Sequence, residues 1–189
     1  DASLAPLDTA TELFVTANSS PAGPALVSAQ DGSFAISWDD LSDASSDVMI
    51  RRADAAGVPI AIELVINDDT QGAPTTEPAL AAFDGFRLVA VFTSARADAG
   101  DIYVQRAHLN QIPLGSNARV NQDNVGGVQA DPAISANATQ AFMVWRDERS
   151  IAGVIATRIF GRRMNADGAF VGNEFEISDA VISTKTAPS

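Results

Sequence analysis

A pattern that recurs at a fixed interval dominates this sequence of 189 residues. Three segments begin with Pro24-Ala25-Leu26, Pro78-Ala79-Leu80 and Pro132-Ala133-Ile134, and the intervals 78 − 24 and 132 − 78 are both equal to 54. Each segment continues into an apolar run that ends in an aromatic residue, which is Trp38, Phe92 or Trp145. Self-similarity of this length is typical of arrays in which each repeat is one supersecondary unit. We therefore expect three copies of one unit.

Each copy contains four short runs with β-strand character. The third run ends in Arg52, Arg106 or Arg163, and the fourth closes at Asn67, Asn121 or Ser178, at the same distance along the chain in every copy. The third copy is longer than the others between Arg146 and Arg158, which predicts a loop insertion there. Four antiparallel strands in a repeat of about 50 residues indicate a β-propeller blade.

The composition of the runs favours a propeller over a β-sandwich. The first run of each copy is small and apolar, as a crowded central axis requires, and the second is apolar at consecutive positions, so both its faces are covered. A sandwich strand would alternate with polar residues that face water. The last run does alternate in Glu174-Phe175-Glu176-Ile177, as an outer strand should. The predicted fold is all-β, a β-propeller-like array of three four-stranded antiparallel blades plus one extra N-terminal outer strand at residues 11–16.

The units resemble the tandem repeats of secreted bacterial β-propeller-like proteins. Those units run Pro-Ala, Asp-Gly, an apolar strand ending in Trp, Ile-Tyr-x-x-Arg and Asp-x-x-Gly. The third unit is the most similar, with Trp145-x-Asp147-x-Arg149 and Ala166-Asp167-Gly168, whereas the second has Phe92 for Trp and Gln111 for Gly. The resemblance extends from Glu12 to Ser178 and implies an architecture and an exported protein. It does not imply an activity, because such folds host binding modules, scaffolds and enzymes.

The period also predicts how the chain is divided. We expect an N-terminal segment with the spare strand at 1–20, blades at 21–69, 70–123 and 124–179, and a tail or the start of a further repeat at 180–189. Three blades are fewer than the usual four to eight of a closed ring. The first and last blades would then expose an apolar face, which predicts a partner. The expected partner is the chain itself, as a homo-oligomer or filament, or further repeats of a longer chain.

Composition excludes several classes of function. The chain has 24 acidic and 12 basic residues and a net charge of −12, which argues against nucleic acid as a partner. The absence of cysteine excludes disulfides, thiolate nucleophiles and cysteine-ligated metals. His108 is the single histidine, so a Ser-His-Asp triad would have to use it and a multi-histidine metal site is excluded. No apolar stretch is long enough to predict a membrane span.

The loops between the last strand of one unit and the first strand of the next are candidate calcium sites. Asn67-Asp68-Asp69-Thr70-Gln71-Gly72 aligns with Asn121-Gln122-Asp123-Asn124-Val125-Gly126. Calcium takes six to eight oxygen ligands from closely spaced Asp, Asn and backbone carbonyls. Asp68, Asp69 and Asp123 are therefore the predicted calcium ligands, and no other cofactor is expected. The alternative is an Asx-turn, in which these side chains bond their own backbone.

Two other hypotheses concern glycans. Trp38 or Trp145 would stack on a sugar while Asp147 bonds its hydroxyls, although core packing is the alternative for both Trp. Glycoside hydrolysis by two carboxylates is the other hypothesis. Strand parity places many acidic residues on one rim, but nothing in the sequence singles out a catalytic pair. They are Asp39, Asp40, Asp43, Asp47, Asp68, Asp69, Asp98, Asp101, Asp123, Asp131, Asp147 and Glu148.

The sequence alone favours a protein that is not an enzyme. We expect a structural and interaction module, outside the cell or at its surface, that assembles or adheres through its open blade faces and its spare edge strand. A lectin-like, glycan-binding propeller module is the first alternative. A glycoside hydrolase-type propeller completed by missing blades is the second.

Overall fold

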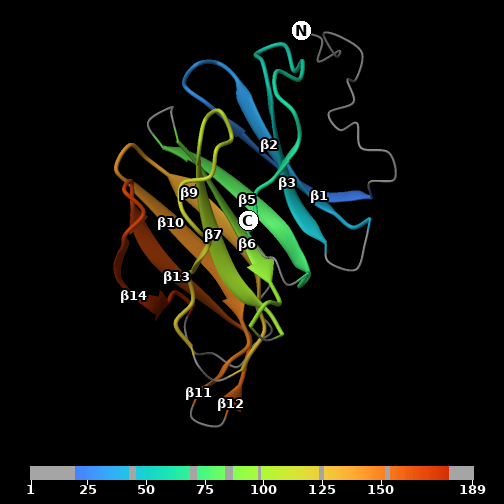
Figure 1. Ribbon diagram of the computed structural model, residues 1–189. Coiled ribbons are helices and arrows are strands. Elements are labelled where there is room, and N and C mark those ends of the chain that lie inside the picture. The colour runs from blue at the N-terminus through green and yellow to red at the C-terminus, as the bar shows by residue number, and fades with distance from the viewer. Residues whose placement is uncertain are drawn as a thin grey trace, which may run out of the picture.

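The computed structural model describes residues 20–42, 46–68, 72–83, 87–97, 99–123, 126–151 and 154–178. These residues form three four-stranded antiparallel sheets and one small hairpin, and no helix occurs among them (Figure 1). The prediction of an all-β, propeller-like array of three four-stranded blades is confirmed. The predicted extra N-terminal strand at 11–16 lies outside the described residues. No helix in the described ranges is long and apolar enough to cross a membrane.

Each sheet corresponds to one copy of the repeat and is called a blade. Blade 1 contains β1 (Pro21–Ser28), β2 (Phe34–Asp40), β3 (Asp47–Ala53) and β4 (Leu64–Val65). Blade 2 contains β5 (Thr75–Phe83), β6 (Arg87–Ser94), β7 (Asp101–His108) and β8 (Ala118–Arg119). Blade 3 contains β9 (Gln129–Ala136), β10 (Gln140–Asp147), β13 (Arg158–Asn165) and β14 (Phe170–Glu176). The hairpin of β11 (Ser150–Ile151) and β12 (Val154–Ile155) lies in the segment where the greater length of the third copy predicts an insertion.

The first strand of each blade lies innermost. Contacts between neighbouring blades are concentrated on β1, β5 and β9, and the short strands β4 and β8 lie at the opposite edge of their sheets. Figure 1 shows β5 flanked by the blades of β1 and β9. Small residues in these strands, such as Ala79 and Ala133, allow the close approach that sequence composition predicts.

A β-bulge interrupts each inner strand next to its proline. The register shifts between Ala22 and Ala25 in β1 and between Thr76 and Ala79 in β5, and β9 shows the same shift opposite Val144 and Arg146. Proline cannot donate to the ladder, so a strand that contains it breaks its pairing there. A bulge also re-aims the side chain that precedes the proline.

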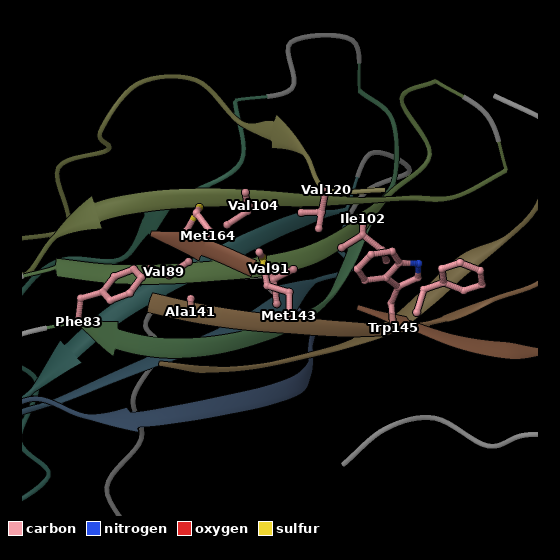
Figure 2. Packing of buried hydrophobic residues seen from close by; sticks show 11 residues of the cluster. Phe83, Val89, Val91, Ile102, Val104, Val120, Ala141, Met143, Trp145 and Met164 are labelled. Atoms are coloured by element: carbon pink, nitrogen blue, oxygen red, sulfur yellow. The ribbon is translucent and has the colours of Figure 1, made fainter. Parts of the chain in front are cut away.

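The core fills the spaces between blades. The side chains between blades 2 and 3 are shown in Figure 2; they are Phe83, Val89, Val91, Ile102, Val104 and Val120 with Ala141, Met143, Trp145, Phe160 and Met164. The alternate residues of β6, Leu88 and Ala90, pack instead against blade 1. The middle strand is therefore buried on both faces, as its unbroken apolar run predicts.

The constant distance from the end of the third run to the end of the fourth has a structural reason. The side chain of Asn67 accepts a hydrogen bond from the backbone N–H of Val48 at 2.9 Å, and Asn121 does the same for Ile102 at 2.9 Å. In blade 3 the hydroxyl of Ser178 accepts from the N–H of Ile159 at 2.9 Å. One polar side chain thus fastens the end of the outer strand to the start of the third strand in each blade.

Candidate functional site

Three acidic residues from three different strands are linked by hydrogen bonds near the start of the inner strands. Glu77 of β5 and Asp131 of β9 immediately precede the bulge prolines, and Asp39 lies near the end of β2. The equivalent position in β1 is Gly23, and a side chain added there would lie 3.0 Å from the Asp39 carboxylate. We call Asp39, Glu77 and Asp131 the axial carboxylate cluster.

Hydrogen bonds connect the cluster across two blade boundaries. The backbone N–H of Glu77 donates to Oδ2 of Asp39 at 3.2 Å. The backbone N–H of Asp131 donates to Oε2 of Glu77 at 2.8 Å, and the Thr93 hydroxyl also lies 2.8 Å from that oxygen. Three blades therefore position the cluster jointly.

Asp39 is the most buried member of the cluster. Its residue is 6% exposed, and its Oδ1 is buried without a hydrogen-bond partner among the described residues. The pKa of Asp39 is raised from 3.8 to about 6, mainly by burial; the hydrogen bond from the Glu77 backbone opposes the rise, and the charge of Glu77 contributes to it. A carboxyl group in this environment holds a proton under mildly acidic conditions.

Asp131 has the opposite environment. Its Oδ2 lies 2.5 Å from Nε of Arg146, whose guanidinium also pairs with Glu148. The hydrogen bond with Asp131 raises the pKa of Arg146 above its ordinary value. The cluster thus combines a buried carboxyl group whose pKa is raised with a carboxylate that is ion-paired with an arginine.

The backbone of the cluster is strained. Glu77 has φ +59° and Asp131 has φ +53°, in the left-handed region that glycine adopts without cost, and Gly23 has φ +53° at the equivalent position. Non-glycine residues held there cost about 1–3 kcal/mol each, and such strain is concentrated at functional sites. Glycine would meet the backbone requirement at all three positions, whereas the two carboxylates add contacts: Glu77 accepts a hydrogen bond from blade 3, and Asp131 pairs with Arg146.

Glu77 is the member that the sequence prediction missed. Asp39 and Asp131 were among the predicted rim residues, but Glu77 was not. The signal was present in the alignment of Gly23-Pro24, Glu77-Pro78 and Asp131-Pro132. Two acidic residues occupy a position at which the first copy has glycine.

The predicted calcium ligands are engaged in contacts between blades. Asp68 accepts a hydrogen bond from the backbone N–H of Asn117 at 2.7 Å and pairs with Arg96 at 2.9 Å. Asp123 accepts a hydrogen bond from the side chain of Asn121 at 2.6 Å, and Asp69 lies outside the described residues. No group of three or more His, Cys, Asp or Glu that could hold a metal ion occurs in the described part of the chain. Calcium binding stays a prediction.

The predicted sugar-binding residues lie inside the protein. Trp145 and Asp147 are fully buried, and Trp38 is 4% exposed. The indole N–H of Trp145 donates to Asp147 at 3.1 Å, and Arg149 binds the same carboxylate through its backbone N–H, Nε and Nη2. Their positions favour the core-packing alternative, and their role in glycan binding stays a prediction. Trp145-x-Asp147-x-Arg149 acts in this structure as an internal brace for the loop after β10.

No protein-family model and no curated protein matches the chain. Solved structures do share its fold. An α-L-arabinanase of Penicillium chrysogenum in complex with arabinobiose has a TM-score of 0.61 and 14% identity, over 87% of this chain and 52% of that one. An α-L-arabinofuranosidase of Lactobacillus brevis has a TM-score of 0.56 and 15% identity, over 85% and 54%. A family 117 glycoside hydrolase of Zobellia galactanivorans has a TM-score of 0.56 and 9% identity, over 88% and 58%.

These similarities correct one prediction and leave others open. The prediction that the chain is not an enzyme is wrong, because the solved structures that share its fold are glycoside hydrolases. The chain spans about half the length of these enzymes. Secretion, adhesion and self-association stay predictions. At 9–15% identity, the likeness shows a propeller fold of the kind that glycoside hydrolases use.

Proposed function

We propose that this chain forms three blades of a glycoside hydrolase propeller and that the axial carboxylate cluster supplies its acid–base chemistry. The strained backbone at Glu77 and Asp131 is the observation that carries the proposal. Glycosidases use a pair of carboxyl groups, one that donates a proton and one that acts as base or nucleophile. Such a site needs neither cysteine nor histidine, so the composition of this chain is compatible with it.

The environments of the three carboxyl groups suggest their roles. Asp39 and Glu77 interact closely enough for one charge to oppose the other, and this pair would hold the proton that the leaving oxygen requires. Asp131, which is ion-paired with Arg146, would activate water or attack the anomeric carbon. Environments that push two carboxyl groups toward different protonation states are the usual basis for dividing acid and base roles.

The similar enzymes suggest the first substrates to test. Two of them act on α-L-arabinosides according to their names. We therefore propose arabinose-containing glycans as the substrate class. Because such polymers are met outside the cell, an extracellular location is part of this proposal.

The test is hydrolysis of aryl glycosides, beginning with 4-nitrophenyl α-L-arabinofuranoside. Glu77→Gln and Asp131→Asn keep the shape and backbone of the site but remove its carboxylates. Each is expected to lower kcat at least about 100-fold, the typical contribution of general acid–base catalysis. Asp54→Asn is the matched control, because Asp54 accepts hydrogen bonds from the backbone of its own turn on the other rim and Asn retains that role. Unchanged rates in both cluster variants, or no hydrolysis of any aryl glycoside by the wild type, would overturn the proposal.

A further inference from the structure

The outer face of blade 3 repeats a pattern that is buried in the other blades. Phe142 and Ile177 occupy the positions that Val89 and Val120 occupy in blade 2. Val89 and Val120 are fully buried against blade 3, whereas Phe142 is 38% and Ile177 is 45% exposed. Phe175 is 46% exposed and stacks on Phe142, with ring centroids 5.9 Å apart. This face, formed by Phe142, Phe175 and Ile177, is built to receive another blade of the same kind.

The far face of blade 1 has the complementary pattern. Leu26 is 64% exposed, whereas Leu80, at the equivalent position of blade 2, is 8% exposed and packs against blade 1. On the neighbouring middle strand β2, Ile36 and Trp38 are already buried, at 8% and 4% exposed. Docking at this face would therefore centre on the inner strand β1 and on the turn after β3.

A polar contact joins blades 2 and 3. The boundary between blades 1 and 2 is joined differently, because Gln111 stands where blade 3 has Gly168 and donates to the backbone carbonyl of Ile50. Arg106 at the end of β7 lies against Gly168 in the turn after β13, and a Cβ at Gly168 would overlap its guanidinium. Arg87 of blade 2 also donates to the backbone carbonyl of Ala166 in that turn at 2.5 Å. The arginine of one blade thus occupies space that the glycine of the next blade leaves open.

The equivalents of Arg106 and Gly168 in blades 3 and 1 have no such contact among the described residues. Arg163 is the equivalent of Arg106 and is exposed, and its side chain makes no hydrogen bond or ion pair with any described residue. Gly57 is the equivalent of Gly168, has φ +80°, and no described atom lies within 4 Å of a Cβ built on it. Blade 3 therefore presents an arginine side chain with no glycine turn of a described blade beside it, and blade 1 presents an open space at Gly57, the slot, with no described arginine in it.

We propose that two copies of this chain close head to tail into a six-bladed ring. Blade 3 of each copy packs Phe142, Phe175 and Ile177 against Leu26 of its partner, and Arg163 enters the slot at Gly57. Each interface joins two different surfaces, and closure by a twofold axis leaves neither surface free. Six blades lie within the usual range for propellers. This inference does not depend on the proposed hydrolase activity.

The mass of the protein in solution tests the ring. Size-exclusion chromatography with light scattering is expected to give twice the chain mass of 19.7 kDa at micromolar concentration. Phe142→Asp, Leu26→Asp and Arg163→Ala should each shift the protein toward the monomer. Ile112→Asp is the matched control, because Ile112 is 56% exposed but belongs to neither face, and this variant should stay dimeric. Circular dichroism of each variant is the control for folding, and a folded spectrum is expected because all the replaced side chains are at the surface.

Mixing the two monomeric variants makes the test specific for head-to-tail pairing. A heterodimer of Leu26→Asp and Phe142→Asp carries both replacements at one interface and none at the other, so mixing should restore a dimer. A wild-type monomer at all concentrations would overturn the proposal. Species larger than two chains, or a Leu26→Asp variant that stays dimeric while Phe142→Asp does not, would also overturn it.

Discussion

Replacing Asp39 by asparagine is expected to stabilise this protein at neutral pH. In the folded state burial raises the pKa of Asp39 from 3.8 to about 6. A pKa unit corresponds to about 1.4 kcal/mol, so keeping this buried carboxylate ionised costs the folded state about 3 kcal/mol. Asparagine has no charge to desolvate, and its side-chain oxygen can still accept the hydrogen bond from the backbone of Glu77.

The sign of the pH dependence follows from the same shift. The folded-state pKa lies above the unfolded value, so between about pH 4 and pH 6 the folded protein binds more protons than the unfolded chain. The contribution of Asp39 to the free energy of unfolding therefore falls as pH rises through this window and is constant above it. The advantage of Asp39→Asn should be about 1 kcal/mol at pH 4.5 and about 3 kcal/mol at pH 7.5.

Urea unfolding monitored by tryptophan fluorescence at these two pH values measures the difference. Asp40→Asn is the control, because Asp40 caps the backbone N–H groups of Ser20 and Ser42 and asparagine can do the same. It should change the free energy of unfolding by no more than about 0.5 kcal/mol at either pH. If Asp39→Asn destabilises the protein, or stabilises it equally at both pH values, then burial does not perturb Asp39 as the structure indicates.

Two further predictions concern the loop after β10 and the packing between blades 2 and 3. Asp147→Ala should lower the free energy of unfolding by about 3–5 kcal/mol, because it leaves the buried guanidinium of Arg149 without its main partner. Asp167→Ala, at an exposed ion pair, should lower it by no more than about 0.5 kcal/mol. Equal losses in urea unfolding would show that the Asp147–Arg149 pair does not stabilise the loop after β10. Gly168→Ala should lower Tm more than Gly115→Ala, since both glycines have positive φ but only the first adjoins a guanidinium of the preceding blade. Equal Tm losses would show that backbone strain alone determines the effect.

The fold could be predicted because the repeat preserves the phase of its strands. The spacing of the prolines at 24, 78 and 132, with the constant distance from the end of the third run to the end of the fourth, aligned the twelve main strands, and the residue composition of each run distinguished inner from outer positions. The constant spacing of Asn67, Asn121 and Ser178 is visible in the sequence, although the hydrogen bonds that their side chains accept are not. The period of a strand assigns each side chain to one face of its sheet, and this assignment determines how the sheets pack on one another.

The site was harder to predict, because its cause lies in backbone geometry. Nothing in the residue types of Glu77 and Asp131 indicates a positive φ, and only their alignment with Gly23 could have suggested it. The lack of cysteine and the single histidine exclude thiol and multi-histidine chemistry but not carboxylate chemistry, for which this chain has 24 acidic residues. Glycoside hydrolysis was only the second alternative, because nothing in the sequence singles out a catalytic pair among these residues. Trp145 was considered as a ligand-binding residue because a sequence does not show that Asp147 satisfies its indole N–H.

The pH dependence of kcat/KM for aryl glycoside hydrolysis tests the central claim most directly. If the Asp39–Glu77 pair supplies the proton, kcat/KM should fall with rising pH above about 6, the pKa of Asp39. Asp39→Asn should remove this limb or shift it while leaving the protein folded. A rate that is constant from pH 5 to pH 8, or an alkaline limb that persists unchanged in Asp39→Asn, would contradict the assignment of the axial carboxylate cluster as the catalytic site.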